Sequence, residues 1–190
     1  MKTENKILMQ QARRSLDGRW GLAIGMYLLF VLISGCTVPL SIILTGPMTL
    51  GMAGYSLKFY RKQPVDVPDL FTGFNNFWNA LLAYLLIIVY VILWSLLLII
   101  PGIIAAISYS QTFYIMSANP SIDPNEAINR SKAMMDGYKW KYFDLCISFL
   151  GWALLCILTL GIGFIWLIPW MQVTFAGFHD DLIKNNNKSI

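Results

Sequence analysis

The sequence predicts an all-α, polytopic membrane protein with six transmembrane helices, paired as three helical hairpins with amphipathic helices on the cytoplasmic face. Three observations predict this fold class. Of the 190 residues, 57% are hydrophobic and 13% are charged, which is about half the charge of a typical soluble domain. The charged residues avoid three long apolar runs. The basic residues all fall in segments that a six-span chain places on one side of the membrane.

The three apolar runs supply the six spans. They extend from Trp20 to Leu57 (38 residues), from Leu70 to Ile122 (53 residues) and from Leu145 to His179 (35 residues). A membrane-spanning helix needs about 20 apolar residues, so each run holds two spans, which are short in the third. A single helix made from the second run would be about 80 Å long, against a hydrocarbon core of about 30 Å. Each run therefore has to turn back.

Proline and glycine mark the turn within each run. Pro cannot continue the helical hydrogen-bond ladder, and Gly accepts the dihedral angles of a tight turn. We expect the hairpin tips at Ser34–Pro39, at Pro101-Gly102 and at Leu160–Gly163. Pro47 and Pro169 lie inside spans, where they could unwind the backbone. The spans are approximately 20–36, 40–58, 78–99, 103–118, 142–160 and 163–179.

The basic residues orient the chain. All fourteen lie before span one, between spans two and three, between spans four and five, or after span six. The positive-inside rule places these segments in the cytoplasm. Both termini are therefore expected to be cytoplasmic, whereas the three outer turns carry no charge.

The N-terminal segment allows a second interpretation. Arg13-Arg14 before an apolar stretch is similar to a twin-arginine signal, and Ile33–Cys36 is similar to a lipoprotein cleavage site. The alternative is a first span that ends in small residues. Asp17 and Arg19 adjoin the apolar stretch, which continues directly into a second span. These features favour the span.

The hairpins repeat with a period near sixty residues. A YSxxFY motif follows the first two tips, at Tyr55–Tyr60 and Tyr109–Tyr114. We expect one domain, 1–190, built from three repeats of approximately 1–62, 63–122 and 123–190. The tips lie at Pro39, Pro101 and about Ile162, and the spans that begin the hairpins start near Trp20, Trp78 and Trp140.

Two of the repeats are expected to begin with an amphipathic helix, within Glu4–Leu16 and after Asp123. In the second of these, Asp123 is the N-cap, Glu126 completes a capping box and Gly137 ends the helix. Each helix has one apolar and one charged face. Such helices either lie on the bilayer, with basic side chains toward anionic headgroups, or pack on the bundle. The sequence leaves both arrangements open.

Catalytic chemistry has little support in the sequence. His179 is the single histidine. It precedes Asp180-Asp181 without a second His or Cys at metal-binding spacing, and GxSxG and CxxC motifs are absent. We expect no enzyme activity, no metal and no cofactor. The basic residues are explained by topology, so nucleic-acid binding is not expected either.

Neutral polar residues inside the spans are the candidate ligand-binding residues. Gln111 and Gln172 lie at equivalent positions of two repeats, and their amides need hydrogen-bond partners in a low-dielectric interior. They either join helices or, with Ser108, Tyr109 and Ser110, bind a small ligand.

Several segments are shared with a known family: "ARRSLDGRW", "PGIIA" with "SYS", "EAI" in the helix after Asp123, "IPW" and "FHDDL". On these segments the chain resembles the bacterial integral membrane family catalogued as "domain of unknown function 975". It is more distantly similar to the membrane domain of some bacterial glycerophosphodiester phosphodiesterases, whose catalytic domain has no counterpart here. The resemblance implies a multi-pass protein of the bacterial plasma membrane and supplies no catalytic residues.

Three classes of function follow from these observations. The favoured one is a non-enzymatic membrane protein that acts as a scaffold, a sensor or a stress-protection protein of the envelope. The alternative is a transporter or flippase for a small neutral, zwitterionic or lipid ligand. A membrane enzyme would rest on His179-Asp180-Asp181 alone.

Overall fold

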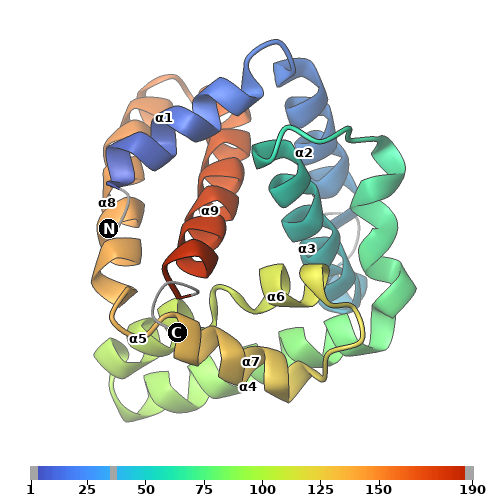
Figure 1. The fold of residues 1–190 in the computed structure, drawn as a ribbon, viewed down its shortest axis with the longest axis vertical. Coiled ribbons are helices and arrows are strands. Elements are labelled where there is room, and N and C mark those ends of the chain that lie inside the picture. Colours follow the sequence, from blue (N-terminus) through green and yellow to red (C-terminus); the bar gives the residue numbers. More distant parts are fainter. Residues whose placement is uncertain (1–3, 35–37, 187–190) are drawn as a thin grey trace. The chain divides into compact units, whose positions relative to one another are not determined.

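A computed structural model of the chain describes residues 4–34 and 38–186 (Figure 1). All regular secondary structure in these residues is helical. The chain forms two compact units, of which unit 1 is Met1–Ile33, Ser56–Val65 and Trp140–Ile190, and unit 2 is Ser34–Tyr55 and Asp66–Lys139. The α-helices are α1 (Asn5–Leu16), α2 (Trp20–Ser34), α3 (Val38–Tyr60), α4 (Phe77–Leu97), α5 (Ile99–Tyr109), α6 (Thr112–Ala118), α7 (Pro124–Met134), α8 (Lys139–Leu158) and α9 (Phe164–Asn186), and η1 (Val67–Asn76) is a 3-10 helix.

The all-α prediction is confirmed for the described residues, and several helices are apolar enough to cross a membrane. Three segments meet the length and composition of a span: Val67–Leu96, Ile99–Ala118 and Lys139–Leu158. Asn5–Leu16 and Trp20–Leu32, bent by 97°, make a fourth if the pair is taken as one span. Neither α3 nor α9 is among them. Three times along the chain, a short helix (α1, η1 or α7) precedes apolar helices, while the three repeats themselves stay a prediction.

In unit 2, α4 and α5 pack against each other, and one extended residue, Leu98, joins them. The tip predicted at Pro101-Gly102 is therefore wrong by about three residues, because both residues lie in the first turn of α5. Proline is tolerated there, since the first N–H groups of a helix have no partner within it. Gly102 has a different role. A side chain at this position would clash with Ser95 of α4, so the glycine permits the close contact between the two helices.

The other two predicted tips have different outcomes. The middle of Ser34–Pro39, residues 35–37, lies outside the described residues, although Pro39 falls in the first turn of α3. The turn at Leu160–Gly163 is confirmed, and it joins α8 to α9 within unit 1. Leu160 and Gly161 have positive φ angles of 54° and 87°, and the Gly161 N–H donates to the Cys156 carbonyl at 3.0 Å. This is the hydrogen-bond pattern of a Schellman helix end.

The prolines inside the predicted spans do not unwind the helices. α3 is continuous through Pro47, and α9 is continuous through Pro169. In α3, small residues near Pro47 instead admit other elements of unit 2. A Cβ at Gly46 would lie 2.8 Å from the Ala80 carbonyl oxygen of α4. The backbone therefore continues as a helix, and glycine, which has no side chain, allows another helix to pack closely against it.

The helix predicted after Asp123 is confirmed as α7 with Asp123 as its N-cap, whereas the Glu126 carboxylate, predicted to complete a capping box, pairs with Arg130 instead. Asp123 caps α7 by accepting hydrogen bonds from the N–H groups of Asn125 at 2.9 Å and Glu126 at 3.3 Å. The Glu126 carboxylate forms an ion pair with Arg130 at 2.6 Å. Gly137, with φ 72°, lies in the turn after the helix. The apolar face of α7 is buried against α4, α5 and α6, so this helix packs on its own unit.

Replacing the cap should loosen α7. We expect Asp123→Ala to reduce the stability of this helix by about 0.5–2 kcal/mol, because two N–H groups lose their acceptor. Amide hydrogen exchange of residues 125–135 in detergent should become faster. Asp136→Ala, which alters an exposed acidic residue beyond the end of α7, is the matched control and should leave exchange unchanged. Equal exchange in Asp123→Ala and the unaltered protein would show that the cap contributes nothing.

In unit 1, α1 lies at 97° to α2 and packs on α9. Gly18, with φ 76°, lies in the turn between α1 and α2. The apolar face of α1 is buried through Leu8, Ala12 and Leu16, whereas Ile7 is 42% exposed. Aromatic rings fill the space between α8 and α9, with ring centroids 5.3 to 6.2 Å apart.

Candidate functional site

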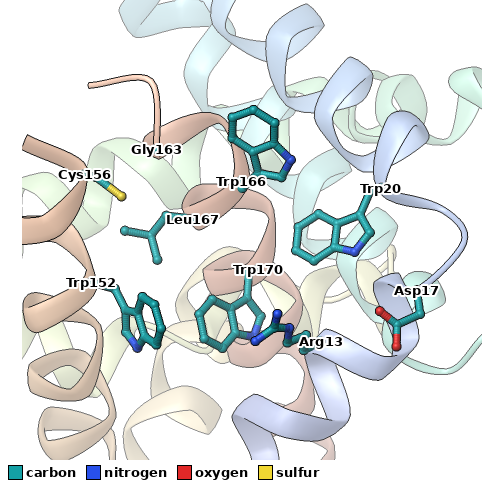
Figure 2. A pocket seen from close by; sticks show the side chains of 9 residues that line it. All are labelled: Arg13, Asp17, Trp20, Trp152, Cys156, Gly163, Trp166, Leu167 and Trp170. Atoms are coloured by element: carbon teal, nitrogen blue, oxygen red, sulfur yellow. The ribbon is translucent and has the colours of Figure 1, made fainter. Parts of the chain in front are cut away.

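The candidate site is a pocket of about 520 Å³ in unit 1, which we call the tryptophan pocket. The α1 end, the first residue of α2 and the α8–α9 hairpin surround it, as Figure 2 shows. Four of the seven tryptophans of the chain contribute to its wall. The lining residues are Arg13, Asp17, Trp20, Trp152, Cys156, Gly163, Trp166, Leu167 and Trp170.

The α8–α9 hairpin brings three of the indole rings together. Trp152 stands nine residues before Gly161 and Trp170 nine residues after it, so a hairpin that turns at Gly161 places them opposite each other. Their ring centroids are 5.6 Å apart, in an edge-to-face arrangement. Trp166 lies one helical turn before Trp170 on α9. Trp152 and Trp166 are about half exposed, whereas Leu167 is buried.

The bend between α1 and α2 brings the charged groups to the pocket. Arg13 lies in the last turn of α1, and Asp17 follows the helix directly, in the bend. Trp20, the first residue of α2, extends the wall on the same side (Figure 2). The Trp170 Nε1–H donates to the Met9 carbonyl at 2.9 Å. This bond fixes α1 against α9.

These groups are suited to binding an amphipathic molecule. Indole rings offer apolar area and negative faces to a bound group, while Arg13 and Asp17 supply one charge of each sign. No set of three or more His, Cys, Asp or Glu side chains that could hold a metal occurs within residues 4–34 and 38–186.

The predicted ligand residues Ser108, Ser110 and Gln111 form a helix junction in unit 2. The Gln111 N–H donates to the Ser131 Oγ at 3.2 Å, and that hydroxyl donates to the Ser108 carbonyl at 2.8 Å. The Gln111 amide group donates to the Ser110 Oγ at 3.0 Å. A side chain of α7 thus enters the hydrogen-bond ladder of the fourth predicted span, which explains its break into α5 and α6.

These contacts are those of residues that join helices. Gln111 and Ser131 are fully buried, and the predicted Tyr109 packs nearby with Ala105 and Ile128. Gln172 lies half-buried on α9, in unit 1. A shared ligand site of Gln111 and Gln172 stays a prediction.

The His179-Asp180-Asp181 segment forms ion pairs within unit 1. Arg61 donates two hydrogen bonds to Asp180, at 2.6 and 3.0 Å, and this contact raises the pKa of Arg61. The Lys141 ammonium lies 2.6 Å from Asp181. His179 is buried beside them on α9. The two aspartates therefore connect α9 with the end of the α3 segment and with α8.

The pocket joins residues that the six-span topology assigns to opposite membrane surfaces. Arg13 and Asp17 belong to the cytoplasmic N-terminal segment, whereas Gly163 was expected at an outer turn. A pocket with a volume of about 520 Å³ is too small to extend across a hydrocarbon core about 30 Å thick. In this structure the α8–α9 turn therefore lies near the α1–α2 bend, which six straight crossings do not predict.

Sequence reasoning did not find the tryptophan pocket. One signal was available, because a turn at Gly161 implies that Trp152 and Trp170 face each other across the hairpin. The contribution of α1 had no comparable signal. Arg13 and Asp17 are more than 130 residues from Trp152, and nothing in the local pattern of α1 indicates which helix it packs on.

Fold and site define a helical protein with several helices that could span a membrane and an aromatic pocket on one unit. A family model described as "Protein of unknown function (DUF975)" matches residues 1–108 and 95–186, and the chain belongs to this family. The two matched segments agree with an internal repeat. No curated protein and no solved structure matches the chain.

Proposed function

We propose that the chain is a non-enzymatic, multi-pass protein of the bacterial plasma membrane. Six spans paired as three hairpins, with both termini in the cytoplasm, follow from its charge pattern. It serves the membrane as a scaffold, a sensor or a stress-protection protein. A second candidate function, the handling of a lipid or small zwitterionic ligand, is favoured by the tryptophan pocket.

The observation that carries the proposal is the meeting of the charged segments in unit 1. The Asn5 side chain donates to Asp144 at 2.7 Å, Arg61 pairs with Asp180, and Lys141 pairs with Asp181. These residues come from the N-terminus, the connection after α3, the start of α8 and the end of α9. The positive-inside rule assigns all of these segments to the cytoplasm, and their direct contacts support a common side.

Exposed apolar stripes on α4 and α8 support the proposal that these helices are surrounded by lipid. Each stripe begins with a tryptophan, Trp78 at 75% and Trp140 at 81% exposure. Near the other end of each helix, Leu96 and Leu158 are also sixty-two residues apart, and their exposed fractions agree, at 83% and 84%. In water such stripes would be unusually large apolar surfaces, whereas lipid accepts them. The shared pattern also supports the predicted repeat, with α4 and α8 as equivalent helices.

Cysteine labelling in intact cells tests the topology. Single cysteines are introduced as Leu98→Cys, Ile162→Cys and Lys132→Cys into a chain whose own three cysteines are replaced by serine. The six-span arrangement predicts that a membrane-impermeant maleimide labels the first two from outside, because both side chains are exposed at hairpin turns. Ile162→Cys is the sharper test, because the structure places the α8–α9 turn near the α1–α2 bend. Lys132→Cys, on the charged face of α7, should react only after permeabilisation.

Two results would contradict this arrangement. Labelling of Lys132→Cys from outside would overturn the assignment of the charged segments to the cytoplasm. Labelling of Ile162→Cys only after permeabilisation would mean that α8 and α9 enter and leave the membrane on the cytoplasmic side. The six-span number would then be wrong, although the orientation of the charged segments would stand.

A further inference from the structure

We infer that the tryptophan pocket binds the ammonium–phosphate zwitterion of a phosphoethanolamine-type headgroup. The inference rests on the proposed membrane location and specifies its ligand-handling candidate. It concerns residues that the sequence analysis did not assign to a ligand.

The ammonium end of such a headgroup fits the indole rings and Asp17. A cation is attracted to the face of an aromatic ring, most strongly to that of tryptophan, and several rings around one cation form the usual recognition site for ammonium groups. Trp20, Trp152, Trp166 and Trp170 surround the tryptophan pocket. The Asp17 carboxylate adds the opposite charge at its rim (Figure 2).

The phosphate end fits Arg13. A guanidinium group can donate two parallel hydrogen bonds to a phosphate, which makes arginine well suited to this anion. Within residues 4–34 and 38–186, Arg13 and Asp17 take part in no ion pair, so both charges are available to a ligand. Both side chains line the same pocket, which therefore offers a ligand one cation and one anion.

A membrane lipid is the favoured source of this headgroup. The pocket volume lies in the range of small-molecule sites, which suits a headgroup and leaves no room for two acyl chains. The half-exposed Trp152 lies on α8 three residues before Leu155, an exposed leucine on the same side of the helix. Acyl chains can therefore follow this exposed apolar side while the headgroup occupies the pocket.

Native mass spectrometry of the full chain in detergent tests the inference. The protein is mixed with equal amounts of phosphatidylethanolamine and phosphatidylglycerol, and we expect it to retain the former preferentially. The double variant Arg13→Gln/Asp17→Asn should lower this retention at least tenfold. Arg14→Gln is the matched control, because Arg14 is the next basic residue of α1 and does not line the pocket.

A second pair of variants tests the aromatic wall. Trp152→Leu should lower retention of phosphatidylethanolamine severalfold, because the pocket loses an indole face. Trp140→Leu removes an exposed tryptophan of the same helix outside the pocket and should have no effect. All variants should remain in the membrane fraction of cells. Loss from that fraction would count against the proposed membrane function and is distinguishable from a failure of the pocket to bind.

The source of the zwitterion is decided by competition with soluble glycerophosphoethanolamine. If this compound does not displace the lipid, the pocket recognises the headgroup as part of a membrane lipid. If it does, the ligand is a free zwitterion of the same chemistry. Equal retention of phosphatidylglycerol, or retention that is indifferent to both Arg13→Gln/Asp17→Asn and Trp152→Leu, would overturn the inference.

Discussion

A methyl group added at Gly73 is expected to lower the free energy of unfolding by about 3 kcal/mol, the upper end of what overpacking usually costs. Gly73 lies in η1 where this helix crosses α3 in unit 2. An added Cβ there would overlap the Pro47 carbonyl oxygen and lie 2.8 Å from the Gly51 nitrogen. Both contacts are backbone atoms of a regular helix, so no side-chain rotation can relieve the overlap. Gly73→Ala must push η1 away from α3.

The same crossing offers a second variant and a matched control within α3. A side chain at Gly51 would overlap the Leu70 carbonyl of η1, whereas at Gly54 it would meet only the Ser117 side chain, at 3.5 Å. Gly51→Ala should therefore destabilise the protein, and Gly54→Ala should be neutral or stabilising, because alanine favours the helix by up to about 1 kcal/mol. Unfolding by sodium dodecyl sulfate in mixed micelles measures all three. Equal stability of Gly51→Ala and Gly54→Ala would show that η1 does not pack on α3 in this way.

Local chemistry made the helix ends predictable. Asp123 caps α7 through its own side chain, and the turn at Leu160–Gly163 depends on residues adjacent in sequence. The shift of the α4–α5 turn shows the limit of this reasoning. Pro101 disrupts a helix interior but is accepted in a first turn, so the same residue is compatible with either position. The close approach of Ser95, which Gly102 permits, is a tertiary contact that local sequence does not reveal.

The junction at Gln111 also depends on a tertiary contact that local sequence does not reveal. Its burial was expected, and so was its need for partners. The partner of its backbone N–H is Ser131, twenty residues away on α7. Ser131 lies on the buried face of that helix. Its place in the ladder between α5 and α6 depends on how α7 docks. For this reason the sequence could identify the amide but could not choose between a helix junction and a ligand site.

Removing the Asp181 carboxylate should also have a large effect, for an electrostatic reason. The Lys141–Asp181 pair has a distance of 2.6 Å, and its side chains are only 12% and 8% exposed. Removing one partner of such a buried pair costs about 3–5 kcal/mol, because the remaining charge stays largely out of water. We expect Asp181→Asn to destabilise unit 1 by about 3 kcal/mol, measured by the same mixed-micelle unfolding. The Phe178 ring, 5.5 Å from the Lys141 ammonium, offsets part of the loss.

Two comparisons separate this electrostatic cost from a general sensitivity to mutation. Arg130 and Glu126 form an ion pair at the same distance of 2.6 Å, but their side chains are 57% and 52% exposed. Glu126→Gln should therefore cost less than about 1 kcal/mol. The double variant Lys141→Met/Asp181→Leu removes both charges and should be more stable than Asp181→Asn alone, because no buried charge remains. If the double variant is less stable than the single one, the Lys141 side chain stabilises unit 1 through contacts other than Asp181, such as that with the Phe178 ring. If Asp181→Asn costs no more than Glu126→Gln, water reaches the Lys141 ammonium, and the contact between the start of α8 and the end of α9 is looser than the structure shows.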